Sequence, residues 1–115
     1  MEENCLFCKI ANKQESAEVV YNSSDIFAIQ DINPQAPTHV LIIPKKHIST
    51  LMDIEAEDQQ MLGMIPEAAK SIAEEFDLEM SGFRLVLNCG MGAGQSVFHI
   101  HWHLLGGRSM TWPPG

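Results

Sequence analysis

Positive charge is scarce in this sequence. Seven of its 115 residues are Lys or Arg and 15 are Asp or Glu, which gives a formal net charge of -8 when the histidines are neutral. Duplex nucleic acid and anionic membranes are bound largely by clustered Lys and Arg. We therefore expect no nucleic-acid partner and no membrane partner. An anionic small molecule would have to be held locally, by backbone amides or histidines.

Cysteine and long apolar runs are scarce as well. The chain has three Cys, an odd number, and its first ten residues, MEENCLFCKI, contain two acids and no long apolar run, unlike a secretory signal. No stretch approaches the ~18 consecutive apolar residues of a membrane-spanning helix. These absences argue against a disulfide framework and predict a reducing, cytoplasmic location.

The remaining composition, with 45% apolar and 19% charged residues, is that of a globular protein with a single domain over residues 1–115. Short apolar runs bounded by turn residues predict strands over 18–21, 26–31, 38–43, 83–88 and 97–105. Helical spacing predicts a short helix over 6–12 and a long one over 54–76, with a kink or a break near Ile65 because Pro66 lies inside it. This order indicates the α+β class, with an antiparallel sheet of five strands covered by helices.

The stretch 88–107, NCGMGAGQSVFHIHWHLLGG, carries the strongest functional pattern. Its histidines, His99, His101 and His103, alternate with apolar residues. Successive strand residues point to opposite faces, so an extended chain would put all three imidazoles on one side, about 6.5 Å apart, whereas a helix would scatter them. Upstream, the glycine-rich segment 90–94 and the short polar residues Gln95 and Ser96 are typical of a backbone-amide cradle for phosphate.

Three interpretations of the histidines are open on these residues alone. They could satisfy hydrogen bonds in the core, they could bind a metal such as zinc, or one of them could attack phosphorus. A metal site would not explain the neighbouring glycine-rich loop, which is typical of phosphate binding. The stretch also contains no carboxylate to complete a metal site. A neutral imidazole whose other nitrogen is held by an acceptor has a free lone pair. We therefore favour phosphoryl or nucleotidyl transfer through histidine.

The pattern over 99–105, His-apolar-His-apolar-His-apolar-apolar, resembles the signature of the histidine triad (HIT) superfamily. The preceding Gly-Gln-Ser and the closing GGRSMTWPPG resemble its Hint branch, the histidine triad nucleotide-binding proteins. The resemblance extends from about Cys5 to the last residue. It implies a HIT-like sheet of five antiparallel strands with one long and one short helix, in which sheet and helix pair across a homodimer.

The resemblance also implies an activity. HIT proteins of this branch hydrolyse the P–N bond of purine nucleoside phosphoramidates, such as adenosine 5'-monophosphoramidate, through a covalent nucleotidyl-histidine, and require no cofactor for catalysis. By this resemblance His101 is the nucleophile, oriented by the carbonyl of His99, and Ser96 lies near the leaving group. The matching phosphate-binding residues are Asn88, Gly94, Ser96 and His103, and the remaining nucleotide-binding positions are His39, Asp31, Ile32, Leu6, Phe7 and Ile10.

Some of these positions have simpler explanations. Asp31, which the resemblance assigns to the ribose hydroxyls, precedes Ile-Asn-Pro and could be a turn former. Leu6, Phe7 and Ile10, assigned to the cleft that receives the base, could be ordinary core residues. Exposure of one face of their helix would separate the two interpretations.

The pair Cys5-x-x-Cys8 is a separate signal. Such a pair can be redox-active, but no strand precedes it as in a thioredoxin-like unit, and two incidental thiols are also possible. By resemblance to HIT members that carry this pair, His47 and His99 would complete a structural zinc site. Cys89 stands outside it.

The tail over 106–115 carries Trp112 but is too short and too rich in proline to add a helix or a central strand. By resemblance, it belongs to a two-fold dimer and approaches the partner's active site on the leaving-group side. Two other function classes stay open: a nucleotide-binding interaction module with little turnover, and a zinc-dependent phosphoesterase.

Overall fold

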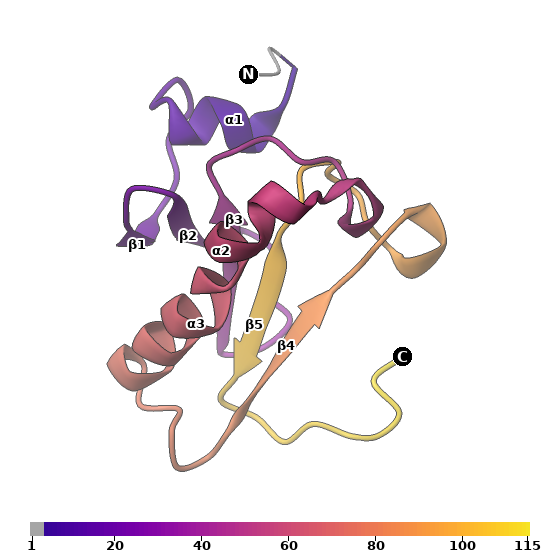
Figure 1. The fold of residues 1–115 in the computed structure, drawn as a ribbon. Coiled ribbons are helices and arrows are strands. Elements are labelled where there is room, and N and C mark those ends of the chain that lie inside the picture. Colours follow the sequence, from indigo (N-terminus) through magenta and orange to yellow (C-terminus); the bar gives the residue numbers. More distant parts are fainter. Residues whose placement is uncertain (1–3) are drawn as a thin grey trace.

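A computed structural model describes residues 4–115, and its centre is a five-stranded antiparallel sheet (Figure 1). The strands are β1 Val19–Asn22, β2 Ile26–Gln30, β3 Thr38–Pro44, β4 Phe83–Leu87 and β5 Trp102–Gly106. Their spatial order is β1-β2-β3-β5-β4, so the last strand of the chain lies between the third and the fourth. The predicted fold class and strand number are confirmed.

The helical segments differ from the prediction at one place. They are α1 Leu6–Ala11, α2 Gln59–Leu62 and α3 Met64–Glu75, with 3-10 turns at Leu51–Asp53, Ala56–Asp58 and Met91–Ala93. The break predicted near Ile65 is confirmed, because the helix is interrupted at Gly63, but its predicted start at Ile54 is wrong, since helical residues begin at Gln59 after a 3-10 turn. Pro66 has no amide to donate to the Leu62 carbonyl and its ring clashes with it, which accounts for a break just before Pro66.

The last strand is also shorter than predicted. It begins at Trp102, so the strand predicted over 97–105 is wrong for its first five residues. The amide of Ile100 instead donates to the Ile48 carbonyl at 2.6 Å, which holds this segment away from the ladder. His103 lies within β5, His101 immediately precedes it, and His99 lies in a bend. The other four strands begin and end within one residue of their predicted bounds.

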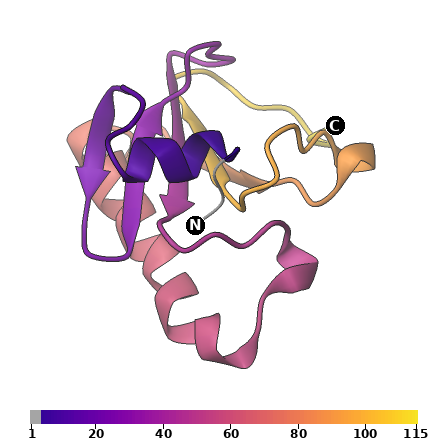
Figure 2. The ribbon, with the colours of Figure 1, turned by 90° about the horizontal axis from the view of Figure 1, so that it is seen from above.

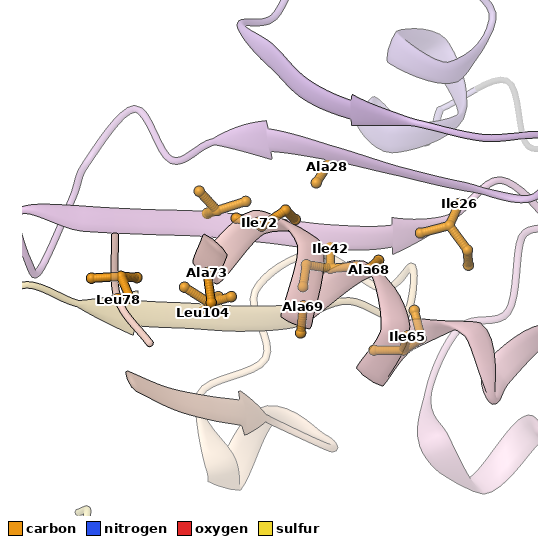
Figure 3. Close-up of a cluster of buried hydrophobic side chains, with 11 residues drawn as sticks. Ile26, Ala28, Ile42, Ile65, Ala68, Ala69, Ile72, Ala73, Leu78 and Leu104 are labelled. Atoms are coloured by element: carbon orange, nitrogen blue, oxygen red, sulfur yellow. The ribbon is translucent and has the colours of Figure 1, made fainter. Parts of the chain in front are cut away.

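The two faces of the sheet are covered differently. Side chains on one face pack against α3, forming the cluster drawn in Figure 3. That cluster comprises Ile26, Ala28, Val40, Ile42, Leu104, Ile65, Ala68, Ala69, Ile72, Ala73 and Leu78. Alternate residues of β2 and β3, among them Phe27 and Leu41, point to the other face and pack against Phe7 and Cys8 of α1.

The C-terminal tail lies on the same side of the molecule as β4. Figure 2 shows the C-terminal tail running from the end of β5, and the tail residues Met110 and Pro114 line one cavity with Asn88, which follows β4. Within residues 4–115, no helix is long and apolar enough to cross a membrane.

Candidate active site

The candidate site lies on the α1 side of the sheet. His39 on β3 and His103 on β5 project from this face, because His39 is opposite Leu105 and Leu41 is opposite His103 in the antiparallel register. The ring centroids of His39 and His103 are 5.1 Å apart, and those of His101 and His103 are 5.2 Å apart. The edge-on ring of Phe7 lies 5.1 Å from that of His101. Two of the triad histidines thus form one cluster with His39.

The orientation of His101 is fixed by the backbone. Its Nδ1 lies 2.8 Å from the carbonyl oxygen of His99, and a carbonyl can only accept a hydrogen bond. Nδ1 therefore carries the proton of the neutral ring, and Nε2 keeps a free lone pair. The ring is 7% exposed, so this lone pair is presented from a nearly buried position.

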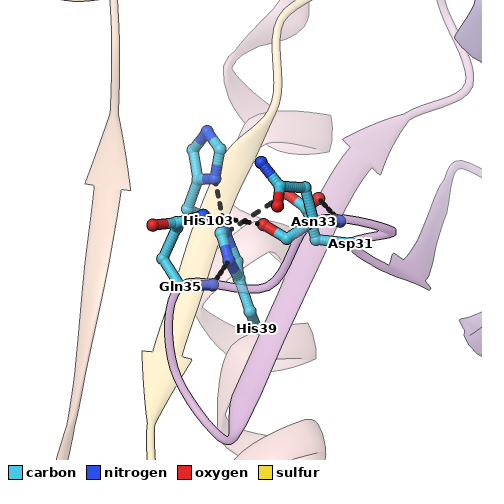
Figure 4. A network of polar contacts seen from close by, with 5 residues as sticks. All are labelled: Asp31, Asn33, Gln35, His39 and His103. Atoms are coloured by element: carbon cyan, nitrogen blue, oxygen red, sulfur yellow. Dashed lines mark hydrogen bonds and ion pairs between the residues drawn. The ribbon is translucent and has the colours of Figure 1, made fainter.

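His103 has the opposite tautomer. The Gln35 amide donates to Nδ1 of His39 at 2.9 Å, which leaves the proton of neutral His39 on its Nε2. That Nε2 lies 2.9 Å from Nδ1 of His103 and 3.4 Å from Oδ2 of Asp31 (Figure 4). His103 Nδ1 is then the acceptor, and its own proton lies on Nε2. The site combines an N–H donor at His103 with a lone pair at His101.

Burial keeps these imidazoles neutral. Burial, with smaller contributions from the neighbouring His101 and His39, lowers the pKa of His103 to about 4, although the charge of Asp31 opposes this shift. Burial also lowers the pKa of His101, although the hydrogen bond to the His99 carbonyl and the charge of Asp31 oppose this shift. The pKa of His39 is lowered by burial despite its contact with Asp31. At neutral pH the cluster is therefore uncharged and able to act through its tautomers.

Gln95 braces the glycine-rich loop. Its Oε1 accepts from the Gly90 amide at 2.8 Å, and its backbone amide donates to the Gly90 carbonyl at 3.1 Å. Its Nε2 donates to the carbonyls of Ser49 and Val97 at 2.8 and 3.1 Å. The sequence suggested only a short polar residue here, and the signal that could have indicated a brace is an amide side chain at the end of a glycine run. Gly94 ends the turn in the left-handed region, at φ 93°.

A cavity of about 580 Å³, called the main cavity below, lies beside the histidine cluster. Its walls include eight of the predicted site residues, namely Leu6, Phe7, Ile10, Asp31, Ile32, Ser96, His101 and His103. Leu6 is 46% exposed and Ile32 is 101% exposed, so these two apolar side chains are not core residues. Two further predicted residues, His39 and Asn88, line a smaller cavity that also touches His103. Gly94 is exposed and lines neither cavity.

His99 belongs to a different group from the other two triad residues. The ligand atoms of Cys5, Cys8, His47 and His99 all lie within 4.8 Å of one another. Nδ1 of His99 is 3.2 Å from Sγ of Cys5 and 3.6 Å from Sγ of Cys8, and Nδ1 of His47 is 3.4 Å from Sγ of Cys8. Nε2 of His99 donates to the Pro44 carbonyl at 2.7 Å, so its Nδ1 lone pair faces the thiols.

The spacing of these atoms fits a tetrahedral metal. With Zn–S near 2.3 Å and Zn–N near 2.1 Å, adjacent sulfur and nitrogen ligands are separated by about 3.5 Å. Cys5 caps the N-terminus of α1 and Cys8 lies within it, while His47 comes from the segment after β3 and His99 from the segment before β5. They form a possible Cys and His metal-binding cluster.

A second group with metal-ligand potential contains Asp31, His39 and His103, whose ligand atoms also lie within 4.8 Å of one another. The absence of a carboxylate from the histidine stretch had counted against a metal there, and the fold supplies Asp31 from another segment. Within this group His39 is hydrogen-bonded to His103 and to the Gln35 amide, whereas Oδ1 of Asp31 accepts from the Asn33 amide at 2.8 Å and its Oδ2 lies 3.4 Å from Nε2 of His39.

Comparison with known proteins gives a consistent family. Residues 4–112 match the family described as "Scavenger mRNA decapping enzyme C-term binding". The crystal structure of a HIT family hydrolase from Legionella pneumophila has a TM-score of 0.95 at 55% identity, covering 97% of this chain and 100% of that one. A histidine triad protein from Clostridium difficile has a TM-score of 0.93 at 38% identity, with 96% of each chain covered.

A relative of named activity points the same way. The purine nucleoside phosphoramidase of Escherichia coli is 44% identical over 110 residues, which are 96% of this chain and 92% of that protein. Its sequence, the two solved structures and the family match all cover nearly the whole of the chain. This protein is therefore a member of the histidine triad (HIT) family of hydrolases.

Proposed function

We propose that this hydrolase cleaves the P–N bond of purine nucleoside phosphoramidates and releases a nucleoside monophosphate and an amine. The observation that carries the proposal is the hydrogen bond from His101 Nδ1 to the His99 carbonyl, which leaves a neutral Nε2 lone pair beside the main cavity. The named activity of the Escherichia coli relative supports the substrate class.

In the proposed reaction, Nε2 of His101 attacks phosphorus and forms a P–N bond to the imidazole. The bond to the leaving nitrogen breaks with its electron pair, and that nitrogen departs as an amine after gaining a proton, with Ser96 close to it. A water molecule then attacks the nucleotidyl-imidazole, which frees the monophosphate and restores His101. None of these steps needs a metal ion or other cofactor.

The other residues hold the substrate. The Nε2–H of His103, the side chain of Asn88 and the loop that ends at Gly94 and Ser96 would bind the phosphate oxygens. His39 fixes the tautomer of His103. The sugar and base would occupy the main cavity, with Asp31 at the ribose hydroxyls and Leu6, Phe7, Ile10 and Ile32 against the purine.

His101→Asn tests the mechanism. The variant should lose at least about 1,000-fold in kcat for an adenosine phosphoramidate, because the covalent pathway is removed, while AMP affinity changes little. Stopped-flow release of a fluorescent amine and calorimetric AMP binding give the two quantities. Substantial turnover by the variant would contradict the mechanism. Slow turnover by the native protein with tight AMP binding would instead indicate an interaction module.

We assign the cluster of Cys5, Cys8, His47 and His99 to a structural metal, zinc by its two thiols and two imidazoles. When bound, zinc would link α1 to the segments that flank β3 and β5. The proximity of Asp31, His39 and His103 favours one rival function, a zinc-dependent phosphoesterase. A chelator that stops catalysis at once while the fold persists would support that rival.

We also propose a homodimer. β4 forms one edge of the sheet, and its Phe83 and Leu85 are 39% and 37% exposed. Trp112 in the tail is 82% exposed, which is unfavourable for so large an apolar ring in water. A symmetric partner along β4 would cover these side chains and bring each tail near the partner's leaving-group side.

A further inference from the structure

A second cavity of about 260 Å³ lies between β4, β5 and the C-terminal tail. His103 is the residue that lines both this cavity and the main one, so the two cavities adjoin at its side chain. Arg84 and Val86 of β4 point into it from the sheet, and Met110 and Pro114 of the tail close it. We refer to it as the tail cavity.

Both arginines of the chain line the tail cavity. Arg84 donates through Nη2 to the Thr111 carbonyl at 2.9 Å. Arg108 donates through Nε to the Gln35 carbonyl at 3.0 Å and through Nη1 to the Ser109 carbonyl at 3.1 Å. These acceptors are neutral, and within residues 4–115 neither guanidinium forms an ion pair with a carboxylate. Two uncompensated positive charges therefore border one small cavity in a chain of net charge -8.

The position of the tail cavity relates it to the scissile bond. In the proposed reaction the nucleoside fills the main cavity and phosphorus lies between His101 and His103. In-line displacement requires the leaving group to depart on the side of phosphorus opposite to Nε2 of His101. Two residues assigned to the phosphate, His103 and Asn88, also line the tail cavity. A group attached to the leaving nitrogen can therefore reach it within a few bonds.

We propose that the tail cavity binds an oxyanion carried by the leaving group, held by Arg84 and Arg108. This inference rests on the proposed function and narrows its substrates to nucleoside phosphoramidates whose amine bears an anionic group, as an amino acid does. Guanidinium groups bind carboxylate and phosphate through paired, charge-assisted hydrogen bonds. The phosphate of a dinucleoside polyphosphate has the same chemistry, so the test must separate these two sources.

The test compares leaving groups that differ only in charge. Adenosine phosphoramidates of glycine and of glycinamide have the same size and the same scissile bond. We expect kcat/KM to be about tenfold higher for the glycine compound, a preference that corresponds to about 1.4 kcal/mol. Arg84→Gln and Arg108→Gln should each remove most of this preference, whereas Arg84→Lys, which retains the charge, should keep part of it. Diadenosine triphosphate, assayed in parallel, shows whether a phosphate leaving group is preferred instead.

The matched control is Lys70→Gln. It removes one positive charge from an exposed position on α3, on the opposite face of the sheet, and should leave the preference unchanged. Equal kcat/KM for glycine and glycinamide compounds in the native protein would overturn the inference, as would a preference that survives both arginine changes. If the two arginine variants lower kcat/KM only for diadenosine triphosphate, the tail cavity binds a phosphate leaving group and not a carboxylate.

Binding measurements separate this inference from the proposed function. If neither phosphoramidate releases its amine, the proposed function fails, but calorimetry can still compare their affinities with and without Arg84→Gln. If the glycine compound binds more tightly than the glycinamide compound and Arg84→Gln abolishes this difference, the oxyanion site stands without the proposed function. Equal affinities would contradict the oxyanion site as well.

Discussion

At the residue scale, two neutral imidazoles of the same type have opposite capacities because their backbone partners differ. The carbonyl of His99 fixes the proton of His101 on Nδ1, while the chain from the Gln35 amide through His39 fixes that of His103 on Nε2. No charge is needed for either effect, and burial removes the charge in any case. His101 therefore supplies a lone pair and His103 an N–H donor, a combination that suits attack on a phosphoryl group.

The lowered pKa of His103 predicts a pH dependence of stability. In the unfolded chain the imidazole titrates near 6.5, and in the folded protein the pKa is about 4. Between these values the unfolded state binds the additional proton, so stability is fully present above pH 6.5 and falls as the pH drops toward 4. Between pH 6.5 and 5 the free energy of unfolding should therefore fall by about 1 kcal/mol less in His103→Asn than in the native protein, after allowance for the partial exposure of His103.

Urea denaturation at each pH measures this difference. His101, His39 and His99 have pKa values lowered in the same direction, so the variant should retain some pH dependence. Identical slopes for the native protein and His103→Asn would show that the His103 pKa is not displaced.

Gln95 is the residue whose importance is least apparent from the sequence. It is 4% exposed, and its side chain makes three hydrogen bonds to the backbone. Gln95→Ala should lower the free energy of unfolding by about 1–3 kcal/mol, because buried donors and acceptors lose their partners. It should also lower kcat/KM, since the phosphate loop loses its brace. Gln35→Ala is the control, because its exposed side chain makes a single bond and its amide to His39 is retained. Similar losses in both variants would contradict the bracing role.

At the scale of elements, the sequence predicts the sheet well and the ends of the active-site strand poorly. Alternating apolar residues and turn formers locate four strands to within one residue. The strand containing His103 begins later than its alternation suggests, because the Ile100 amide bonds to Ile48, a residue far away in the chain. Local periodicity contains no information about such a partner. The tautomers of His39 and His103 escape prediction for the same reason.

The separation of His99 from the other triad histidines has the same origin. Alternate spacing predicted three imidazoles on one strand face, and the bend before β5 instead directs His99 toward Cys5 and Cys8. The proposed metal ligands could be named from the family resemblance, whereas their convergence depends on three separate segments. Arg84 and Arg108 were not predicted, since nothing in their local sequence links β4 to the tail.

Removal of a metal should loosen α1 before it affects the sheet. α1 has six residues, too few for stability in isolation, and Cys5 and Cys8 connect it to the rest of the site. Elemental analysis of untagged protein should give about one zinc per chain, and Cys5→Ser should lose it. Hydrogen exchange of the Phe7 and Cys8 amides should then accelerate more than that of the β3 amides. A native preparation without metal, with both thiols titratable, would contradict the assignment.

At the scale of the whole molecule, the tail and the exposed edge of β4 predict assembly. Sedimentation at micromolar concentration should give twice the chain mass if the proposed homodimer forms. Truncation after Ser109 should change selectivity among amine leaving groups more than it changes AMP affinity, because tail residues line the tail cavity, whereas none of them lines the cavity proposed for the nucleoside. A monomer, or a truncated protein with unchanged selectivity, would show that the tail has another role.

The position of β5 has a consequence for how the protein folds. β5 follows β4 in the chain but lies between β3 and β4, so β4 has no neighbour in the sheet until β5 has inserted. The register that unites His39 with His103 joins positions 64 residues apart, and contacts of such sequence separation form slowly because a long loop must close first. A nascent chain or trapped intermediate could hold α3 against β2 and β3 and still have no nucleophile in position. Catalytic competence should therefore appear only in the final cooperative step of folding.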